Sequence, residues 1–214
     1  MKKILYTLLL VAVTTTQLAQ AAKIRDYFIM EPGNLFLTLS QGTRAGMITT
    51  AEEKRESQAD NRMGGVAKIT TLDDDYMTIE TSPCKSVELK LLTKGTKDTV
   101  IAVIETVKLP VTDSRISFYS TKWKPLKTKK HFKQMPTIKD FLLPNAEKGK
   151  AKEVLSNLHF PLIVLKFSGP QHQQVVATQQ LKKFYSEEDY QKMGKFLKDS
   201  INYSITGTEI ILTK

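Results

Sequence analysis

The sequence predicts an α+β fold, consisting of an antiparallel β-meander with short flanking helices, followed by a smaller α+β C-terminal part. Three observations predict it. Apolar residues recur with a period of two from Val66 to Thr121, short helical spacings come before that region, and strand and helix patterns alternate after a basic run. The connections between the predicted strands are short, which favours antiparallel pairing.

The chain divides into four predicted segments. These are a signal peptide (1–22), N-terminal helices plus the β-meander (23–124), a basic linker (125–136) and the C-terminal α+β part (137–214). One continuous domain over 23–214 is the alternative, because a chain of about 190 residues can bury enough surface for a single core.

The N-terminus has the pattern of a secretory signal peptide. Lys2 and Lys3 precede an apolar run from Ile4 to Val13, and small residues follow at Ala19 and Ala21. The apolar run is much shorter than the roughly 20 residues that span a bilayer, so no transmembrane segment is expected after cleavage. We therefore expect an exported protein that resides in the periplasm, at the cell surface or outside the cell.

The segment before the meander is predicted to contain two short helices broken near Gly42. Leu35, Leu39 and Met47 recur there at broadly helical spacings. The charged stretch 52–62 follows, and we expect it to form an exposed helix end and a loop.

The predicted strands of the meander are five runs at 66–72, 75–82, 86–92, 99–107 and 115–121. In the third run, apolar residues alternate with Glu88 and Lys90, so one face is expected to contact a core and the other to contact water. In the fourth run, residues 100–104 are apolar on both faces, which is typical of a central strand covered on both sides.

The C-terminal part is predicted to start with a helix at 148–158 and a buried strand at 161–167 that turns into 175–184. Ser186 is expected to cap a further helix, whose first turn is acidic and so complements the helix dipole. The chain is then predicted to end in a hairpin that turns near Gly207.

Charge and cysteine content restrict the function only loosely. The formal net charge is +10, and removal of Lys2 and Lys3 with the signal peptide leaves 10 − 2 = +8. A basic exported protein can be attracted to anionic envelope polymers or to acidic partners, but net charge defines no fold or mechanism. The single cysteine, Cys84, cannot form an internal disulfide, and we expect a buried apolar role, with pairing to another chain as the alternative.

Motifs of known catalytic chemistry are absent from the sequence. It contains no G-x-S-x-G, no H-E-x-x-H and no paired cysteines with metal spacing. Asp73, Asp74 and Asp75 lack the EF-hand spacing, so a solvated hairpin turn is favoured over a calcium site. Neither a metal nor a cofactor is predicted, and catalytic residues stay unassigned, although remote carboxylates or Cys84 with a histidine base remain open.

A basic run with interleaved aromatic residues is the candidate binding site. Its predicted binding residues are Lys122, Trp123, Lys124, Lys127, Lys129, Lys130 and Lys133. Lysines in such a run can contact phosphate or sulfate groups while rings stack on bases or sugars. The alternative is a solvated linker in which Trp123 is a core anchor. No physiological nucleic acid is expected as a partner of an exported protein.

Four stretches carry a resemblance to a known family: "DDDYMTIETS", "SVELKLL", "DTVIAVIETV" and "DSRISFYSTKW". In this order, after a signal peptide and a helical segment ending in two glycines, they resemble the exported Bacteroidales proteins of the domain of unknown function 3256 family. The resemblance extends from about Tyr27 to the C-terminus and is firmest between Gly64 and Trp123. The resemblance implies export from a Bacteroidales cell, and it assigns no catalytic residues to this sequence.

Two hypotheses of different classes follow from these observations. The first is a non-catalytic envelope or surface interaction module that binds an envelope protein or an anionic glycan. The second is a hydrolase that acts on envelope or dietary polymers, which would require converging carboxylates or a histidine in a cleft.

Export can be tested by intact-mass analysis of protein purified from the native host. The mass should show the loss of the first 21 or 22 residues, because the small residues near Ala21 provide the cleavage site. Full-length chain in the cytoplasm would contradict this prediction.

Overall fold

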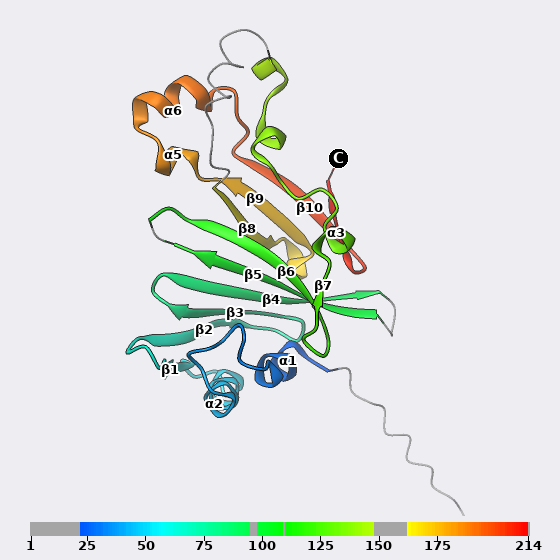
Figure 1. Ribbon diagram of the computed structural model, residues 1–214. Helices are drawn as coiled ribbons and strands as arrows, with labels where there is room; N and C mark the ends of the chain where they lie inside the picture. Colours follow the sequence, from blue (N-terminus) through cyan, green and yellow to red (C-terminus); the bar gives the residue numbers. More distant parts are fainter. Residues whose placement is uncertain (1–21, 95–97, 109, 148–161, 214) are drawn as a thin grey trace, which may run out of the picture.

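The computed structural model describes residues 22–94, 98–108, 110–147 and 162–213 (Figure 1). The predicted signal peptide and the predicted helix at 148–158 therefore lie outside the described residues. Two antiparallel sheets and two N-terminal helices form the body of the protein. This arrangement confirms the predicted α+β class and the antiparallel meander.

The first sheet, sheet A, has seven strands that pair in the order of the sequence. They are β1 (Gln58–Asp60), β2 (Val66–Leu72), β3 (Tyr76–Ser82), β4 (Lys85–Lys94), β5 (Asp98–Val107), β6 (Asp113–Ser120) and β7 (Pro125–Leu126). Strands β2 to β6 coincide with the five predicted runs. The short edge strand β1 lies where a loop was expected, so that part of the prediction is wrong.

The second sheet, sheet B, has four strands in the order β11-β10-β9-β8. They are β8 (Ile163–Ser168), β9 (Gln174–Gln179), β10 (Ser200–Thr206) and β11 (Glu209–Leu212). The predicted hairpin joins β10 to β11, and Gly207 supplies the positive φ of 60° in its turn.

Short helices complete the C-terminal part. They are α3 (Thr128–His131), η1 (Ile138–Phe141), η2 (Pro144–Glu147), η3 (Pro170–His172), α5 (Leu181–Phe184) and α6 (Glu187–Gly194). Ser186 caps α6 as predicted, because its hydroxyl accepts a hydrogen bond from the Asp189 amide at 3.2 Å. None of the described helices is long and apolar enough to cross a membrane.

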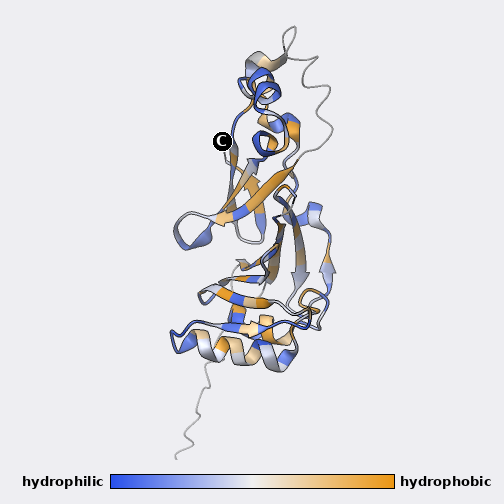
Figure 2. Ribbon diagram, turned by 90° about the vertical axis from the view of Figure 1, so that its left-hand side faces the viewer, coloured by the Kyte–Doolittle hydropathy of each residue, from blue (hydrophilic) through white to orange (hydrophobic). Residues whose placement is uncertain are grey.

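Sheet A is the middle layer of the protein, with the N-terminal helices on one face and sheet B on the other (Figures 1 and 2). The five residues from Val100 to Ile104 in β5 are all buried. Ile101 and Val103 pack towards α1 (Ile24–Met30) and α2 (Gln41–Glu52), whereas Val100, Ala102 and Ile104 pack towards sheet B. The prediction of a doubly covered strand is confirmed.

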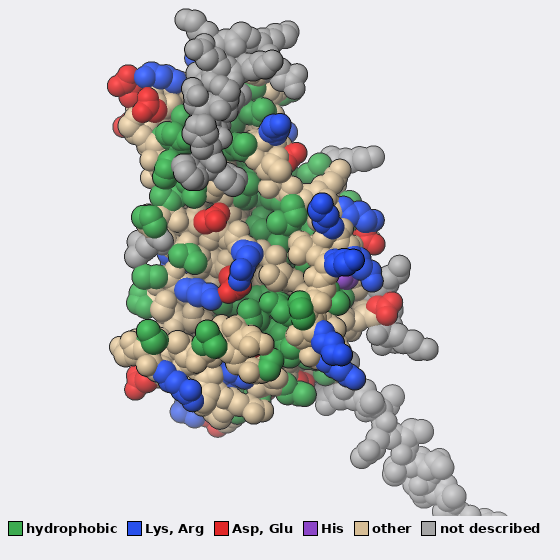
Figure 3. All heavy atoms as spheres, viewed as in Figure 1, with side chains coloured by type: hydrophobic (Ala, Val, Ile, Leu, Met, Phe, Trp, Pro, Cys, Tyr) green, Lys and Arg blue, Asp and Glu red, His purple; other side chains and the backbone are tan. Residues whose placement is uncertain are grey.

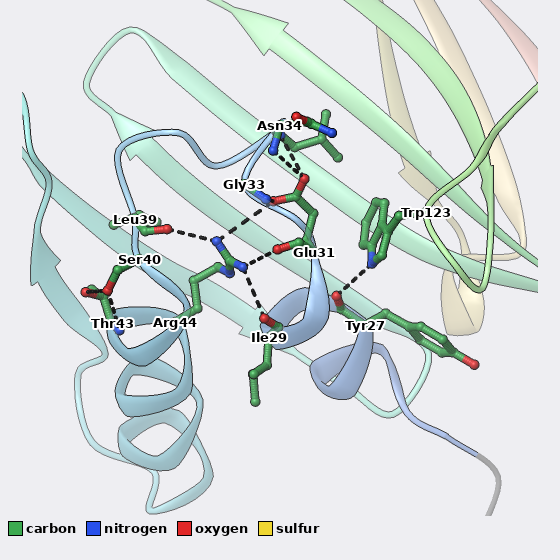
Figure 4. Close-up of polar contacts among 11 residues, drawn as sticks. Tyr27, Ile29, Glu31, Gly33, Asn34, Leu39, Ser40, Thr43, Arg44 and Trp123 are labelled. Atoms are coloured by element: carbon green, nitrogen blue, oxygen red, sulfur yellow. Dashed lines mark hydrogen bonds and ion pairs between the residues drawn. The ribbon is translucent and has the colours of Figure 1, made fainter.

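The connection between α1 and α2 is held by two buried charged side chains (Figure 4). The Glu31 carboxylate accepts hydrogen bonds from the backbone amides of Gly33, Asn34 and Leu35. The Arg44 guanidinium donates to the carbonyls of Leu39, Ile29 and Glu31. Burial lowers the pKa of Arg44, and the nearby Glu31 charge opposes that shift.

The predicted helix break near Gly42 is wrong, because Gly42 lies inside the first turn of α2. The helix begins one residue earlier, where the Ser40 hydroxyl accepts a hydrogen bond from the Thr43 amide at 3.1 Å. Leu35 and Leu39 lie before the helix, in the connection that Arg44 and Glu31 fix. The segment predicted as the first helix is therefore an irregular connection, held by hydrogen bonds between its backbone and the side chains of Arg44 and Glu31.

Glu88 and Lys90 of β4 are buried between the two sheets, with exposed fractions of 7% and 0%. The prediction that they face water is wrong, because sheet B covers this face of the meander. Glu88 accepts hydrogen bonds from the Tyr76 hydroxyl at 2.8 Å and from the Phe167 amide of β8 at 3.1 Å. Lys90 donates to the Asp75 carboxylate at 2.6 Å.

The turn between β8 and β9 packs onto this polar cluster. Lys90 donates to the Gln171 carbonyl at 2.8 Å, and the His172 ring stacks on Tyr76 with a centroid distance of 3.6 Å. Burial, and then the charge of Glu88, raise the pKa of the Tyr76 hydroxyl. Burial also raises the pKa of Glu88, although its hydrogen bonds oppose the shift.

Cys84 lies in the turn between β3 and β4 as a free, partly exposed cysteine. The expected buried role is therefore wrong. The turn places the side chain at the rim of the sheet, outside both hydrophobic cores.

Trp123 is a core residue on the helical side of sheet A, with 9% of its surface exposed. Its indole N–H donates to the Tyr27 carbonyl at 3.1 Å and so joins the β6–β7 turn to α1 (Figure 4). The Trp123 backbone has a positive φ of 57°, which is uncommon for a bulky residue. Packing of the ring therefore determines the local conformation.

Trp123→Ala should lower the free energy of unfolding by about 3–5 kcal/mol, because it removes a buried aromatic ring and leaves a cavity. Trp123→Phe is the matched variant, since it keeps a ring and loses the hydrogen bond to Tyr27, and its cost should be smaller. Urea denaturation measures both. Wild-type stability of the alanine variant would place the ring outside the core.

Glu88→Gln should become more favourable, relative to wild type, as the pH rises through the unfolded pKa of Glu88 and then through its higher folded pKa. The raised pKa means that the folded protein keeps the Glu88 proton to a higher pH than the unfolded chain does. The stability contributed by the neutral carboxyl is complete below the unfolded pKa and is lost as the pH rises through the folded pKa. Glutamine is uncharged throughout and avoids this loss, which urea denaturation across the pH range measures.

Glu105→Gln is the matched control with the opposite sign. Burial would raise the pKa of Glu105, but hydrogen bonds from Arg115 and Lys85 outweigh it, and the pKa is lowered. The stability from the ionised carboxylate is present above the unfolded pKa and is lost as the pH falls through the folded pKa. The free energy of unfolding of this variant should therefore fall, relative to wild type, as the pH rises. The same trend in both variants would contradict the opposite pKa shifts of Glu88 and Glu105.

Candidate functional site

The basic run of the sequence forms a strap that joins the two sheets. We define the basic strap as residues 122–133. Its strand β7 pairs with β6 at the edge of sheet A, and Phe132 at its other end forms a β-bridge with Ile210 of sheet B. The strap is therefore hydrogen-bonded to both sheets, and Trp123 is the core anchor that the alternative expected at its start.

Three buried aromatic residues fix the backbone of the basic strap. Trp123 anchors its start, and His131 and Phe132, with exposed fractions of 2% and 0%, anchor its end. The His131 Nδ1 atom donates to the Thr208 carbonyl at 2.8 Å, because a carbonyl oxygen can only accept a hydrogen bond. Phe132 packs edge-on against Tyr203, with centroids 4.8 Å apart.

The six lysines among the predicted binding residues are exposed on the basic strap. They are Lys122, Lys124, Lys127, Lys129, Lys130 and Lys133. Lys133 contacts the Glu209 carboxylate at 3.2 Å, and the other five have no acidic partner in the part of the chain that the structure describes. Figure 3 shows basic side chains gathered along the flank that β7 and α3 occupy in Figure 1.

Trp123 does not belong to this surface. The sequence grouped it with the lysines, but its ring is buried against α1 and cannot stack on a ligand at the surface. The correction follows from the β6–β7 turn, which directs the ring into the core while the neighbouring lysines remain outside.

A cavity of about 360 Å³ lies beside the strap, and Lys130 and His131 form part of its wall. Asp98 and Glu209 also line it, so acidic side chains border the basic surface on this side. The Nε2 atom of His131 is buried and has no hydrogen-bond partner.

A larger groove, about 630 Å³ in volume, begins where the basic strap ends. We call it the sheet B groove. It lies between the segment that follows the strap and strands β10 and β11, and it is lined by Gln134, Met135, Asp140, Asn202, Tyr203 and Leu212, among others. The groove combines amide, hydroxyl and carboxylate groups with apolar side chains, as ligand sites commonly do.

Tyr203 is the most buried polar residue of the sheet B groove, with 1% of its surface exposed. Its hydroxyl forms no hydrogen bond with another residue in the described part of the chain. Burial, and then the charge of Asp140, raise the pKa of Tyr203 to about 12. The hydroxyl therefore keeps its proton at physiological pH and can act as a donor.

The acidic turn of the meander is held by basic side chains. Asp74 contacts Lys23 at 2.9 Å and Arg25 at 3.0 Å, and Asp75 contacts Lys90. Among the described residues, no group of three or more histidine, cysteine, aspartate or glutamate side chains could hold a metal ion. The turn joins β2 to β3 and its Asp74 side chain is 69% exposed, so the predicted solvated hairpin turn is confirmed, with ion pairs in addition.

The two histidines that the structure describes do not come together. His131 lies in the basic strap and His172 packs on the polar cluster between the sheets, while His159 lies outside the described residues. Sequence reasoning missed the sheet B groove, because Gln134 and Tyr203 are far apart in the chain and neither belongs to a recognisable motif. The one sequence signal for this groove is the alternation of polar and apolar residues along β10, which marks Asn202 as an exposed polar residue.

Comparison with solved structures supports the fold. The structure of a domain of an uncharacterized protein from Porphyromonas gingivalis W83 is similar, with a TM-score of 0.76 and 22% sequence identity. The similarity covers 89% of this chain and 97% of that chain. At this identity the likeness concerns the fold alone.

A search of curated proteins found no match to the sequence. A family model described as "Protein of unknown function (DUF3256)" matches residues 16–209, which is most of the chain and includes every strand of both sheets up to the start of β11. The chain belongs to this family.

Proposed function

We propose that the protein is an exported, non-catalytic interaction module of the cell envelope that binds an anionic glycan through its basic strap. One observation carries the proposal: five exposed lysines, which have no acidic partner among the described residues, lie on a backbone that three buried aromatic side chains fix. A fixed backbone reduces the conformational entropy that a ligand must overcome on binding.

The location of the protein supports a glycan as the anion. The N-terminal pattern favours export, and anionic polysaccharides and lipopolysaccharide are the polyanions of the cell envelope. Nucleic acid would offer the same charge, but it is not a physiological polymer of that compartment. Lysine ammonium groups act as point charges and suit sulfate, phosphate and carboxylate groups without a fixed geometry.

The proposal is tested by the salt dependence of heparin binding. Changing Lys127, Lys129 and Lys130 together to glutamine should weaken binding. It should also reduce the magnitude of the slope of log K against log salt by about 2 to 3, because the ligand releases fewer counterions on binding when three lysine contacts are lost. Fold stability should change little, since exposed lysines contribute weakly to it. Fluorescence anisotropy with a labelled heparin fragment measures the affinity at several salt concentrations.

The matched control changes Lys54, Lys182 and Lys183 to glutamine, which lowers the net charge equally at exposed positions outside the strap. This variant should keep most of the wild-type slope. Equal losses in both variants would mean that net charge alone attracts heparin. A wild-type protein that does not bind at low salt would overturn the proposal, and release of reducing ends from an envelope polysaccharide would favour the hydrolase instead.

A further inference from the structure

We infer that the sheet B groove is a saccharide subsite, which binds one or two sugar rings of the glycan whose anionic groups contact the basic strap. This inference rests on the proposed function and adds the class of ligand that the neighbouring groove recognises. The strap and the groove are continuous, because Gln134 of the groove follows Lys133 directly and Phe132 packs against Tyr203.

The polar groups of the groove match the chemistry of sugar hydroxyls. The side-chain amides of Gln134 and Asn202 are exposed and form no hydrogen bond with any residue that the structure describes. Each amide offers both a donor and an acceptor, so it can bond two neighbouring hydroxyls of one ring. The Asp140 carboxylate accepts from the Thr137 amide and hydroxyl, both at 2.7 Å and both through Oδ2, which leaves Oδ1 as a further acceptor.

The Tyr203 hydroxyl is the second observation that points to a ligand. Only 1% of the surface of Tyr203 is exposed, and its hydroxyl has no hydrogen-bond partner among the described residues. The hydroxyl is not fully enclosed, so a ligand can reach it. A buried tyrosine hydroxyl usually finds a hydrogen-bond partner. Because Tyr203 lines the groove, a hydroxyl group of a ligand can supply that partner.

Apolar side chains of the groove suit the carbon face of a sugar ring. Leu212 and Met135, with exposed fractions of 41% and 38%, both line it. The volume of about 630 Å³ lies within the range of small-ligand sites, which is roughly 300–1,000 Å³. A purely ionic ligand would use neither the amides nor the apolar surface.

The test measures the affinity for a heparin-derived hexasaccharide over a range of salt concentrations. Tyr203→Phe keeps the buried ring and removes only the hydroxyl, so thermal stability should be unchanged. The affinity should fall roughly three- to tenfold at every salt concentration, as expected for one lost hydrogen bond, with the slope of log K against log salt unchanged. Asn202→Ala should have a similar effect, and Tyr185→Phe, which removes a partly buried hydroxyl outside the groove, should have none.

Inorganic polyphosphate separates charge from sugar recognition. It should bind the basic strap, and Tyr203→Phe should leave its affinity unchanged. In NMR spectra, the side-chain amide resonances of Asn202 and Gln134 should shift with the hexasaccharide and not with polyphosphate.

The outcomes distinguish the two proposals. Unchanged hexasaccharide affinity in both Tyr203→Phe and Asn202→Ala would overturn the saccharide subsite and leave the strap in place. An equal loss of polyphosphate affinity in Tyr203→Phe would also overturn it. If Tyr203→Phe and Asn202→Ala weaken hexasaccharide binding but the lysine triple variant keeps the wild-type slope of log K against log salt, the strap is not the anion site and the groove is still a saccharide site. If the wild-type protein does not bind the hexasaccharide at low salt, both proposals are wrong.

Discussion

The fold depends on the burial of β5 from both sides. Val100 to Ile104 are five consecutive buried residues, and an apolar strand of this kind is stable in water only if each face has a cover. α1 and α2 cover one face, and sheet B covers the other. The three layers of the protein therefore follow from one strand, because neither the helices nor sheet B alone could exclude water from it.

The second cover imposes a requirement on the polar residues of β4. Glu88 and Lys90 point towards sheet B, and burial without partners would cost several kcal/mol for each charged group. Both sheets supply those partners: Tyr76 and Asp75 from sheet A, and the backbone of β8 and its following turn from sheet B. The Glu88 carboxylate also accepts a hydrogen bond from the Phe167 amide of the edge strand β8. This amide is then not available to pair with a strand of another chain.

The same packing separates the structural part of the basic strap from its exposed part. The strap passes from the edge of sheet A to sheet B, so its aromatic residues enter the cores on both sides and its lysines remain in solvent. Phe132 and Tyr203 then connect the strap to the sheet B groove. The strap thus leads directly into a polar groove, whose other wall comes from strands β10 and β11 far along the chain.

The sequence alone determined the local elements. Its period-two runs place β2 to β6, Ser186 marks the start of α6 and Gly207 marks the last turn, because these signals depend on neighbouring residues only. Only the tertiary structure decided the environment of each face. The alternation around Glu88 and Lys90 is the same whether water or a second sheet lies opposite, and Tyr203 becomes a groove residue only after β10 and the segment at Gln134 meet. Such contacts are long-range, so no local pattern encodes them.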